Sequence, residues 1–270
     1  MNNHSRRLRP LGRCAVITGA SSGIGAEFAR KLAAQGIFLV LTGRNEKALK
    51  AIAVEVGSEN CVIIPADLSK VRECIDFYGK AKKYDPDILI NNAGFGLYGA
   101  FHESSLSREL EMIDVNIKAM HILFKLFLQD FVKKDRGYIL NVASIAGFMP
   151  GPLMAAYYSS KAYVLRQTAA VQTELRSIKS RVRVSVLCPG PVDTQFNRRA
   201  GITGFFKGIT APRCVAWTLS EMQHGKAIIT PSIKITLIAF LSKLLPIRLA
   251  SFGAYLVQKG KKLIDDEKNS

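Results

Sequence analysis

The sequence lacks the cysteine patterns that build disulfide frameworks or metal sites. Its five cysteines are scattered, with no CxxC pair and no histidine at ligand spacing, and they stand at Cys14, Cys61, Cys74, Cys188 and Cys214. This pattern favours buried thiols in a reducing compartment over disulfides, and it predicts no metal site. The chain of 270 residues also lacks internal repeats, low-complexity stretches and a Pro/Gly/Ser-rich linker, so we expect one large domain.

Long uninterrupted hydrophobic runs are also missing. The basic residues 1–12 lead only into the short apolar run CAVIT, and the N-terminus lacks both a signal-peptide core and a cleavage site. Near the C-terminus, Lys234, Lys243 and Arg248 interrupt an apolar segment, whose uncharged runs fall short of the roughly 20 residues that a spanning helix needs. We therefore expect a cytoplasmic protein that is not secreted and that can lie peripherally on a membrane.

Acidic residues are scarce in the last part of the chain. Between Thr194 and Ile264 there are eleven lysines and arginines but a single acidic residue, Glu221, and the whole chain carries a net charge of +17. Such a surface can meet nucleic acid, an anionic membrane or a phosphate-bearing substrate, or it can simply be solvated. No nucleic-acid-binding module and no basic patch interleaved with aromatics is present, so we expect no nucleic-acid partner.

What the sequence does contain is an alternation of short apolar runs with helical segments. Seven runs of β-branched and aliphatic residues suit strands that are buried on both faces of a parallel sheet. Together with the helical crossovers they predict an α/β fold, a Rossmann-type doubly wound parallel sheet of about seven strands. The predicted strands are 14–18, 37–42, 61–66, 87–91, 138–142, 182–188 and 226–230.

The composition changes after Pro231, where Leu, Ile and Lys become frequent. Beyond Pro246, Leu249, Phe252 and Leu256 fall on one side and polar residues recur on another, which predicts an amphipathic helix. The pattern leaves open whether this extension binds an anionic membrane surface or packs on the domain or a partner, with surface binding by residues 232–264 favoured. The predicted organisation is a basic extension at 1–12, a catalytic domain at 13–231 and a C-terminal helical extension at 232–270.

A glycine-rich turn follows the first predicted strand, in TGASSGIGAEFARKL. Gly19, Gly23 and Gly25 fall where a backbone must approach a phosphate and where a helix N-terminus can hold it. The GxxxGxG spacing differs from the GxGxxG of other dinucleotide folds, and by itself it is also compatible with a tight turn that binds nothing.

The stretch TGASSGIG resembles the cofactor loop of classical short-chain dehydrogenase/reductases, and further motifs follow in the family's order. They are Asp67–Leu68, Asn91–Gly94, Asn116, Ser144, Tyr157 with Lys161, and Pro189–Thr194. The resemblance covers residues 13 to about 230 and is closest to membrane-associated NADP-dependent members, whose C-termini also end in Leu- and basic-rich helices. It implies a Rossmann fold that binds a nicotinamide dinucleotide.

The residue after the second strand bears on the choice of cofactor. NAD enzymes place a carboxylate there for the ribose hydroxyls, whereas Gly43 and Arg44 stand at this point, and a guanidinium can pair with a 2′-phosphate. Lys47 can add charge, so we expect NADP(H). The cofactor residues that the resemblance implies are Gly19, Ser21, Ser22, Gly23, Ile24, Gly25, Arg44, Asp67, Leu68, Asn92, Ala93, Gly94, Tyr157, Lys161, Pro189, Gly190, Val192 and Thr194.

A tyrosine and a lysine four residues apart on a helix are neighbours, and an ammonium lowers the pKa of a nearby phenol. Spacing alone does not choose between Tyr157 and Tyr158, since both can neighbour Lys161. The family's Y-x-x-x-K pattern selects Tyr157 as the acid/base and leaves Tyr158 to packing. The resemblance further implies that Ser144 polarises the carbonyl, that Lys161 binds the ribose and tunes the tyrosine, and that Asn116 completes a tetrad.

The stretch 197–212 is Gly-rich and predicts a mobile substrate lid, and Phe196, Phe205 and Phe206 indicate an apolar ligand. We expect NADPH-dependent reduction of a ketone to a secondary alcohol in a lipophilic substrate, such as a 3-oxoacyl chain or a steroid-like ring. The alternative is an NADP-binding sensor or scaffold at a membrane surface that does not turn over. By resemblance, a homo-oligomer forms through helices near Asn116 and Tyr157.

Overall fold

The computed structural model describes residues 11–194, 196, 200, 202–203, 208–260 and 262–263. The basic N-terminal extension expected at 1–12 therefore lies outside the described residues, except for its last two positions.

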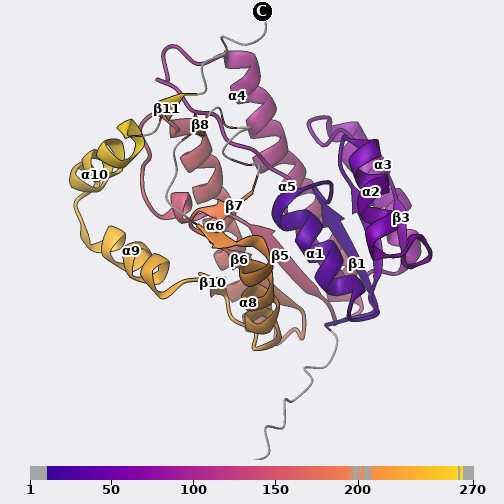
Figure 1. The fold of residues 1–270 in the computed structure, drawn as a ribbon. Helices are drawn as coiled ribbons and strands as arrows, with labels where there is room; N and C mark the ends of the chain where they lie inside the picture. Colours follow the sequence, from indigo (N-terminus) through magenta and orange to yellow (C-terminus); the bar gives the residue numbers. More distant parts are fainter. Residues whose placement is uncertain are drawn as a thin grey trace, which may run out of the picture.

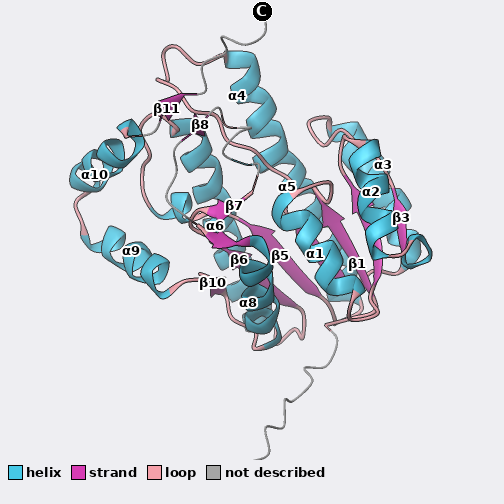
Figure 2. Cartoon of the chain, in the orientation of Figure 1, coloured by secondary structure: helices cyan, strands magenta, loops and turns pink. Residues whose placement is uncertain are grey.

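The fold is built on a seven-stranded parallel sheet in the order β10-β6-β5-β4-β1-β2-β3 (Figure 2). All seven predicted strands form. Their bounds are β1 Cys14–Thr18, β2 Phe38–Thr42, β3 Cys61–Ile63, β4 Ile88–Asn91, β5 Tyr138–Val142, β6 Arg183–Leu187 and β10 Ile228–Ile229. The predicted Rossmann-type doubly wound fold is thus confirmed.

Helices cover both faces of this sheet, because its strands carry apolar side chains on both sides. Along β1, Cys14 and Val16 belong to one hydrophobic cluster, and Ala15 and Ile17 belong to the other. The first cluster is closed by α3 (Val71–Ala81), α5 (Met120–Lys133) and α6 (Ala155–Ser177). The second is closed by α1 (Gly23–Ala33), α2 (Glu46–Val56) and α8 (Ala211–Gln223).

Shorter elements complete this domain and its rim. They are the 3₁₀ turns η1 Ser58–Asn60, η2 Lys82–Tyr84 and η4 Ile145–Phe148, the helix α4 Leu106–Ile113, the π-helical turn η3 Asp114–Ala119, and the strands β7 Val192–Asp193, β8 Ile202–Thr203, β9 Ile209–Thr210 and β11 Lys262–Leu263. The short strands pair as β7 with β9 and as β11 with β8.

The strand order reverses between β1 and β4, so the loops after these two strands diverge. In an open parallel sheet, such a switch point opens a crevice at the carboxyl ends of the strands, where ligands bind. The topology therefore fixes the position of the site before any side chain is considered.

The C-terminal extension forms two helices, α9 (Ile233–Leu244) and α10 (Ile247–Lys259), which run along one side of the molecule beyond the sheet (Figure 1). We call them the C-terminal arm. Ile235 of α9 packs directly on the segment after β6, since a Cβ added to Gly190 would lie 2.4 Å from its Cδ1. Among the described helices, none has both the length and the apolar character that crossing a membrane requires.

The predicted helix after Pro246 is present, but the face that it buries is not its large apolar one. Its buried residues are Ala250, Ala254 and Gln258, which are spaced four apart. Leu249 and Phe252 are exposed by 60% and 61%. The domain accepts small side chains here because α10 lies close against it, and the large apolar side chains point away.

Candidate active site

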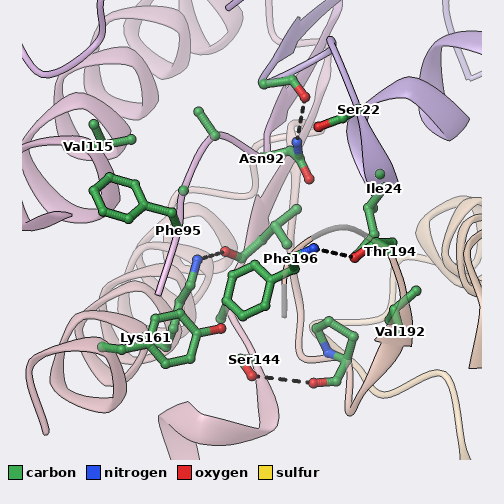
Figure 3. Close-up of a pocket in the computed structure, with 18 of the residues that line it drawn as sticks. Ser22, Ile24, Asn92, Phe95, Val115, Ser144, Lys161, Val192, Thr194 and Phe196 are labelled. Carbon is green, nitrogen blue, oxygen red and sulfur yellow. Dashed lines mark hydrogen bonds between the residues drawn. The ribbon is translucent and has the colours of Figure 1, made fainter. Parts of the chain in front are cut away.

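A cavity of about 540 Å³ opens at the carboxyl ends of the strands, within the size range of ligand pockets. It is lined by residues from the loops after β1, β2, β3, β4, β5 and β6, from α6, and from α10 (Figure 3). Of the site residues predicted from the sequence, all except Gly25 and Asn116 line it.

The glycine loop leaves no room for side chains where it turns into α1. A Cβ added to Gly25 would lie 2.3 Å from the carbonyl oxygen of Gly19, and Gly19 itself has a φ of 65°. The first turn of α1 contains no acidic residue, and Ser22, Gly23 and Ile24 line the cavity. A helix N-terminus with this geometry attracts anions, so the cradle fits the pyrophosphate of a dinucleotide.

Asn92 fastens this loop to the neighbouring strand. Its Nδ2 donates to the carbonyl oxygen of Thr18 at 2.9 Å, and its backbone N–H donates to the Thr18 hydroxyl at 2.9 Å. The Ala93 N–H donates to the same hydroxyl. The NNAG motif therefore locks the loops after β1 and β4 together, in addition to bordering the cavity.

Arg44 reaches the cavity rim, as predicted, but it does not stand alone. Its Nη1 lies 2.5 Å from Oε1 of Glu111 on α4, and Arg108 pairs with the same carboxylate. Both arginines line the cavity. No local pattern indicated Glu111, because α4 approaches the loop after β2 only in the tertiary structure. A ligand phosphate at Arg44 must share the guanidinium with this carboxylate.

Asp67 lies at the same end of the cavity as Arg44, and its side chain is in the carboxylate form. Burial by itself raises the pKa of Asp67, but hydrogen bonds from Ser69 and the charges of Arg44 and Lys70 outweigh it and hold this pKa below its usual value. The Ser69 hydroxyl and N–H donate at 2.8 and 3.1 Å. Asp67 is thus a fixed hydrogen-bond acceptor beside the pocket.

Ser144 and Lys161 lie at the other end of the cavity (Figure 3), and Tyr157 lines the cavity beside them. Ser144 follows β5 and caps η4 by accepting a hydrogen bond from the Ala146 N–H at 3.2 Å. Tyr157 lies in the first turn of α6, and Lys161 follows one turn later with its Nζ 5.9 Å from the Tyr157 ring centroid. The buried Nζ of Lys161 donates to the carbonyl oxygen of Val142 at 2.9 Å.

Burial shifts the proton affinities of this pair in opposite directions. It raises the pKa of Tyr157, while a hydrogen bond with Ser144 works against that rise. It lowers the pKa of Lys161 to about 8. Tyr157 therefore holds its proton at neutral pH, whereas the neighbouring Lys161 loses its charge just above neutral pH.

Asn116 stands in the π-helical turn η3, outside the cavity lining but behind it. Its Oδ1 accepts from the Phe95 N–H at 3.0 Å, and its Nδ2 donates to the Phe95 carbonyl at 2.9 Å and to Ser160 Oγ at 3.1 Å. A Cβ added to Gly94 would lie 2.8 Å from Asn116 Oδ1 and 3.3 Å from Lys161 Nζ. Single π turns are frequent at functional sites, and this one joins the loop after β4 to α6.

The segment after β6 closes the cavity on the remaining side. Gly190, Val192 and Thr194 line it. Thr194 lies next to Gly23, since a Cβ added to Gly23 would be 3.5 Å from the Cβ of Thr194. Phe196 also lines the cavity, with its ring centroid 5.5 Å from that of Tyr157. Half of the predicted lid at 197–212, including Phe205 and Phe206, lies outside the described residues.

Tyr158 and Gln258 are among the cavity residues that were not predicted as site residues. The ring of Tyr158 does pack, since a Cβ added to Gly151 would lie 2.3 Å from its ring atoms, but Tyr158 also borders the cavity and its hydroxyl accepts a hydrogen bond from Gln258 Nε2. Assigning Tyr158 to packing alone was therefore incomplete. Gln258 carries no motif and reaches the site only because α10 folds back over it.

A family model for short chain dehydrogenases matches residues 13–203. The chain belongs to the short-chain dehydrogenase/reductase family. A protein named as an uncharacterized oxidoreductase of Staphylococcus saprophyticus is 37% identical over 187 residues, which cover 67% of this chain and 79% of that protein. Membership makes this protein an oxidoreductase that works with NAD or NADP.

Solved short-chain dehydrogenases share this architecture over most of its length. One from Sphingobium yanoikuyae, in complex with NADPH, is 26% identical, with a TM-score of 0.79 over 96% of this chain and 99% of that one. Another from Burkholderia phymatum, in complex with NAD, is 25% identical, with a TM-score of 0.78 over 86% of this chain and 93% of that one. The solved structures that resemble this short-chain dehydrogenase/reductase therefore include complexes with NADPH and with NAD.

Proposed function

We propose that this short-chain dehydrogenase/reductase uses NADPH to reduce a ketone to a secondary alcohol in a lipophilic substrate. The observation that carries the proposal is the convergence of Ser144, Tyr157 and Lys161 on one wall of a cavity whose opposite end is a phosphate cradle. A bound NADPH supplies the hydride, and the side chains of this chain manage the proton and the developing charge.

Tyr157 is the proton donor in this scheme. Because burial raises its pKa, the phenol is protonated at neutral pH and can donate to the alkoxide that forms as the carbonyl carbon accepts hydride. The neighbouring Lys161 ammonium stabilises the phenolate that remains. Ser144 Oγ hydrogen-bonds the substrate oxygen and holds it within reach of Tyr157.

The preference for NADPH rests on Arg44. No carboxylate of the loop after β2 stands at this point of the rim, and a guanidinium there can pair with a 2′-phosphate. The neighbouring solved structures contain either cofactor, so they support the dinucleotide and leave the choice to this residue.

The lipophilic character of the substrate is supported by the outer part of the cavity. Phe95, Met154 and Phe196 line it together with the ring faces of Tyr157 and Tyr158. Apolar walls of this kind favour a hydrocarbon chain or ring, while the reacting carbonyl points to Ser144 and Tyr157.

The test is an assay of the purified full-length protein against linear and cyclic ketones, with NADPH and NADH oxidation followed in parallel. We expect turnover with NADPH and a loss of about a thousandfold in kcat/KM for Tyr157→Phe. The matched control is Tyr163→Phe, on the same helix but outside the cavity lining. NADPH binding without reduction of any ketone would favour the sensor or scaffold alternative, and absence of both would refute either function.

A further inference from the structure

Gln258 and Tyr158 form a polar pair in the otherwise apolar outer wall of the cavity. Gln258 is only 2% exposed, and its Nε2 donates a hydrogen bond to the Tyr158 hydroxyl. Both side chains line the cavity. They come from α10 and α6, which lie a hundred positions apart in the sequence.

Each member of this pair has hydrogen-bonding capacity left over. Gln258 Oε1 is buried and has no partner among the described residues. The Tyr158 oxygen accepts a hydrogen bond from the Gln258 amide. Its own O–H has no acceptor among the described residues. Burial raises the pKa of Tyr158, so this hydroxyl keeps its proton. A buried acceptor without a partner is costly, and one carried by a side chain that lines a cavity can be satisfied by a ligand.

The backbone around Gln258 is fixed, so the unpaired oxygen is held in place. The Tyr98 hydroxyl donates to the Gln258 carbonyl oxygen at 3.0 Å. Ala254 and Ala250, one and two turns earlier on the same face, are also buried. This anchoring gives the pair the preorganisation that a specific hydrogen-bonding site requires.

We propose that Gln258 and Tyr158 form a specificity site for a hydroxyl or amide group that the lipophilic substrate carries away from its reacting carbonyl. Such a group offers a donor for Gln258 Oε1 and an acceptor for the Tyr158 O–H, which matches the unused capacity on both sides. An anionic group does not match, because it would face the Gln258 oxygen. The proposal deepens the proposed function and rests on it for the position of the carbonyl.

The test uses methyl ketones that carry one hydroxyl at successive carbons of a saturated chain, each compared with the parent ketone. For the wild-type protein we expect one hydroxyl position to raise kcat/KM by about tenfold to a hundredfold, mainly through KM. Gln258→Met keeps the length of the side chain but removes both polar atoms, and it is expected to abolish that preference. Ser251→Ala, on the same helix but outside the cavity lining, should retain it.

A second measurement separates this inference from the reaction itself. The same ketones are titrated by calorimetry into NADPH-saturated Tyr157→Phe protein, with and without Gln258→Met, so that the preference is read as affinity without turnover. If no hydroxyl position is preferred, or if the preference survives Gln258→Met, the inference is wrong even where the parent ketone is reduced. If the preference appears in binding but nothing is reduced, the specificity site stands and the proposed reaction fails.

The C-terminal arm carries a second and independent feature, an exposed apolar surface. Twelve of the 22 large apolar side chains that are exposed in the described residues lie between Ile233 and Val257. They are Ile233, Leu237, Ile238, Phe240, Leu241, Leu244, Leu245, Ile247, Leu249, Phe252, Leu256 and Val257. Contiguous exposed apolar surface of this kind marks an interaction site.

The charges on the arm indicate what covers this surface. Lys234, Arg248 and Lys259 are exposed on the same two helices, and residues 232–260 contain no acidic side chain. A two-fold contact between copies would bring this patch against itself, with cations facing cations and no carboxylate to pair them. An anionic lipid surface satisfies the apolar and the cationic groups together.

We infer that the arm binds an anionic membrane surface, with α9 and α10 lying in the interface. The test is flotation of the full-length protein with phosphatidylcholine vesicles, with and without phosphatidylserine. We expect binding that strengthens with phosphatidylserine, and the double change Phe240→Ser with Phe252→Ser should weaken it by about tenfold or more. Trp217→Ser, an exposed aromatic on α8, is the matched control.

Two outcomes would overturn this inference. One is flotation that the double change leaves intact. The other is a concentration-dependent dimer, seen by sedimentation without lipid, that the double change dissolves, because that result assigns the surface to a second copy.

Discussion

The Rossmann core and the C-terminal arm are both rich in apolar residues, but they place them in opposite ways. In the core, Val16 and Ile17 on β1 are fully buried, one in each hydrophobic cluster. In the arm, Ala250 and Ala254 are buried while Leu249 and Phe252 face outward. An apolar residue therefore becomes core only where a neighbouring element covers it, and the outer face of the arm has no such neighbour among the described residues.

The two regions also treat polar groups differently. At the cofactor end, Asn92 and Asn116 are half-buried and buried, and both hydrogen-bond the backbone of adjacent loops. Where the arm meets the cavity, Gln258 keeps an unpaired oxygen. The contrast distinguishes polar groups that hold the scaffold from one that is available to a ligand.

The largest effect is expected from adding one methyl group to the glycine cradle. Gly25→Ala forces a Cβ to within 2.3 Å of the Gly19 carbonyl oxygen, and since both are backbone-fixed the loop must move. We expect a loss of about 3 kcal/mol in unfolding free energy and at least a hundredfold loss in dinucleotide affinity. Urea denaturation and fluorescence titration with NADPH measure the two. Unchanged affinity would show that the cradle does not hold the phosphates.

A stability gain is expected from removing the buried charge in the active site. The pKa of Lys161 falls from the ordinary 10.5 to about 8, so below pH 8 the folded protein bears the cost of a buried ammonium. That shift corresponds to about 3 kcal/mol in the free energy of unfolding. Lys161→Met removes this cost but also loses the hydrogen bond to Val142, which reduces the gain in stability by about 1 kcal/mol.

The sign of this effect changes with pH in a defined window. Between pH 8 and 10.5 the unfolded chain holds a proton that the folded chain has released, so the wild type gains stability as pH rises. The advantage of Lys161→Met should therefore be greatest below pH 8 and become a loss of about 1 kcal/mol above about pH 10.5, where only the missing hydrogen bond to Val142 counts. Over the same window, kcat/KM for ketone reduction should fall as the ammonium is lost. A stability difference independent of pH would contradict the assignment.

A smaller effect is expected at the cofactor rim. Glu111→Gln removes the carboxylate that pairs with Arg44 at 2.5 Å, which leaves the guanidinium available to a 2′-phosphate. NADPH affinity should rise by about threefold to tenfold while NADH affinity changes little. Parallel titrations with both dinucleotides check this, and Glu109→Gln on the same helix is the control. Equal changes for both would place the phosphate elsewhere.

The smallest effect sharpens the contrast between the two regions. Gly253 lies within α10 and an added Cβ meets nothing within 4 Å, in contrast to Gly25. Gly253→Ala should stabilise the protein by about 0.5–1 kcal/mol through helix propensity. A loss of stability in urea denaturation would show that this part of the arm is covered.

Much of the cofactor end was predictable because its determinants are local. Gly19, Gly23 and Gly25 suit the backbone needs of one loop, and the family's Y-x-x-x-K pattern selected Tyr157 with Lys161, where spacing alone left Tyr158 open. Glu111 was not predictable, since α4 carries no mark that it will meet Arg44. Gln258 was likewise invisible, because an isolated glutamine in a Leu-rich helix predicts nothing until α10 is placed over the cavity.

By itself, the sequence determined the seven strands and the parallel sheet, since both follow from short-range periodicity. Its resemblance to a known family, carried by short motifs, indicated the glycine cradle and the Tyr157–Lys161 pair. Only the tertiary structure decided that Arg44 is shared with Glu111, that Tyr158 borders the pocket, and that α10 turns small residues inward and large ones outward. Those outcomes depend on contacts between segments far apart in the chain, and no local pattern encodes which surfaces meet.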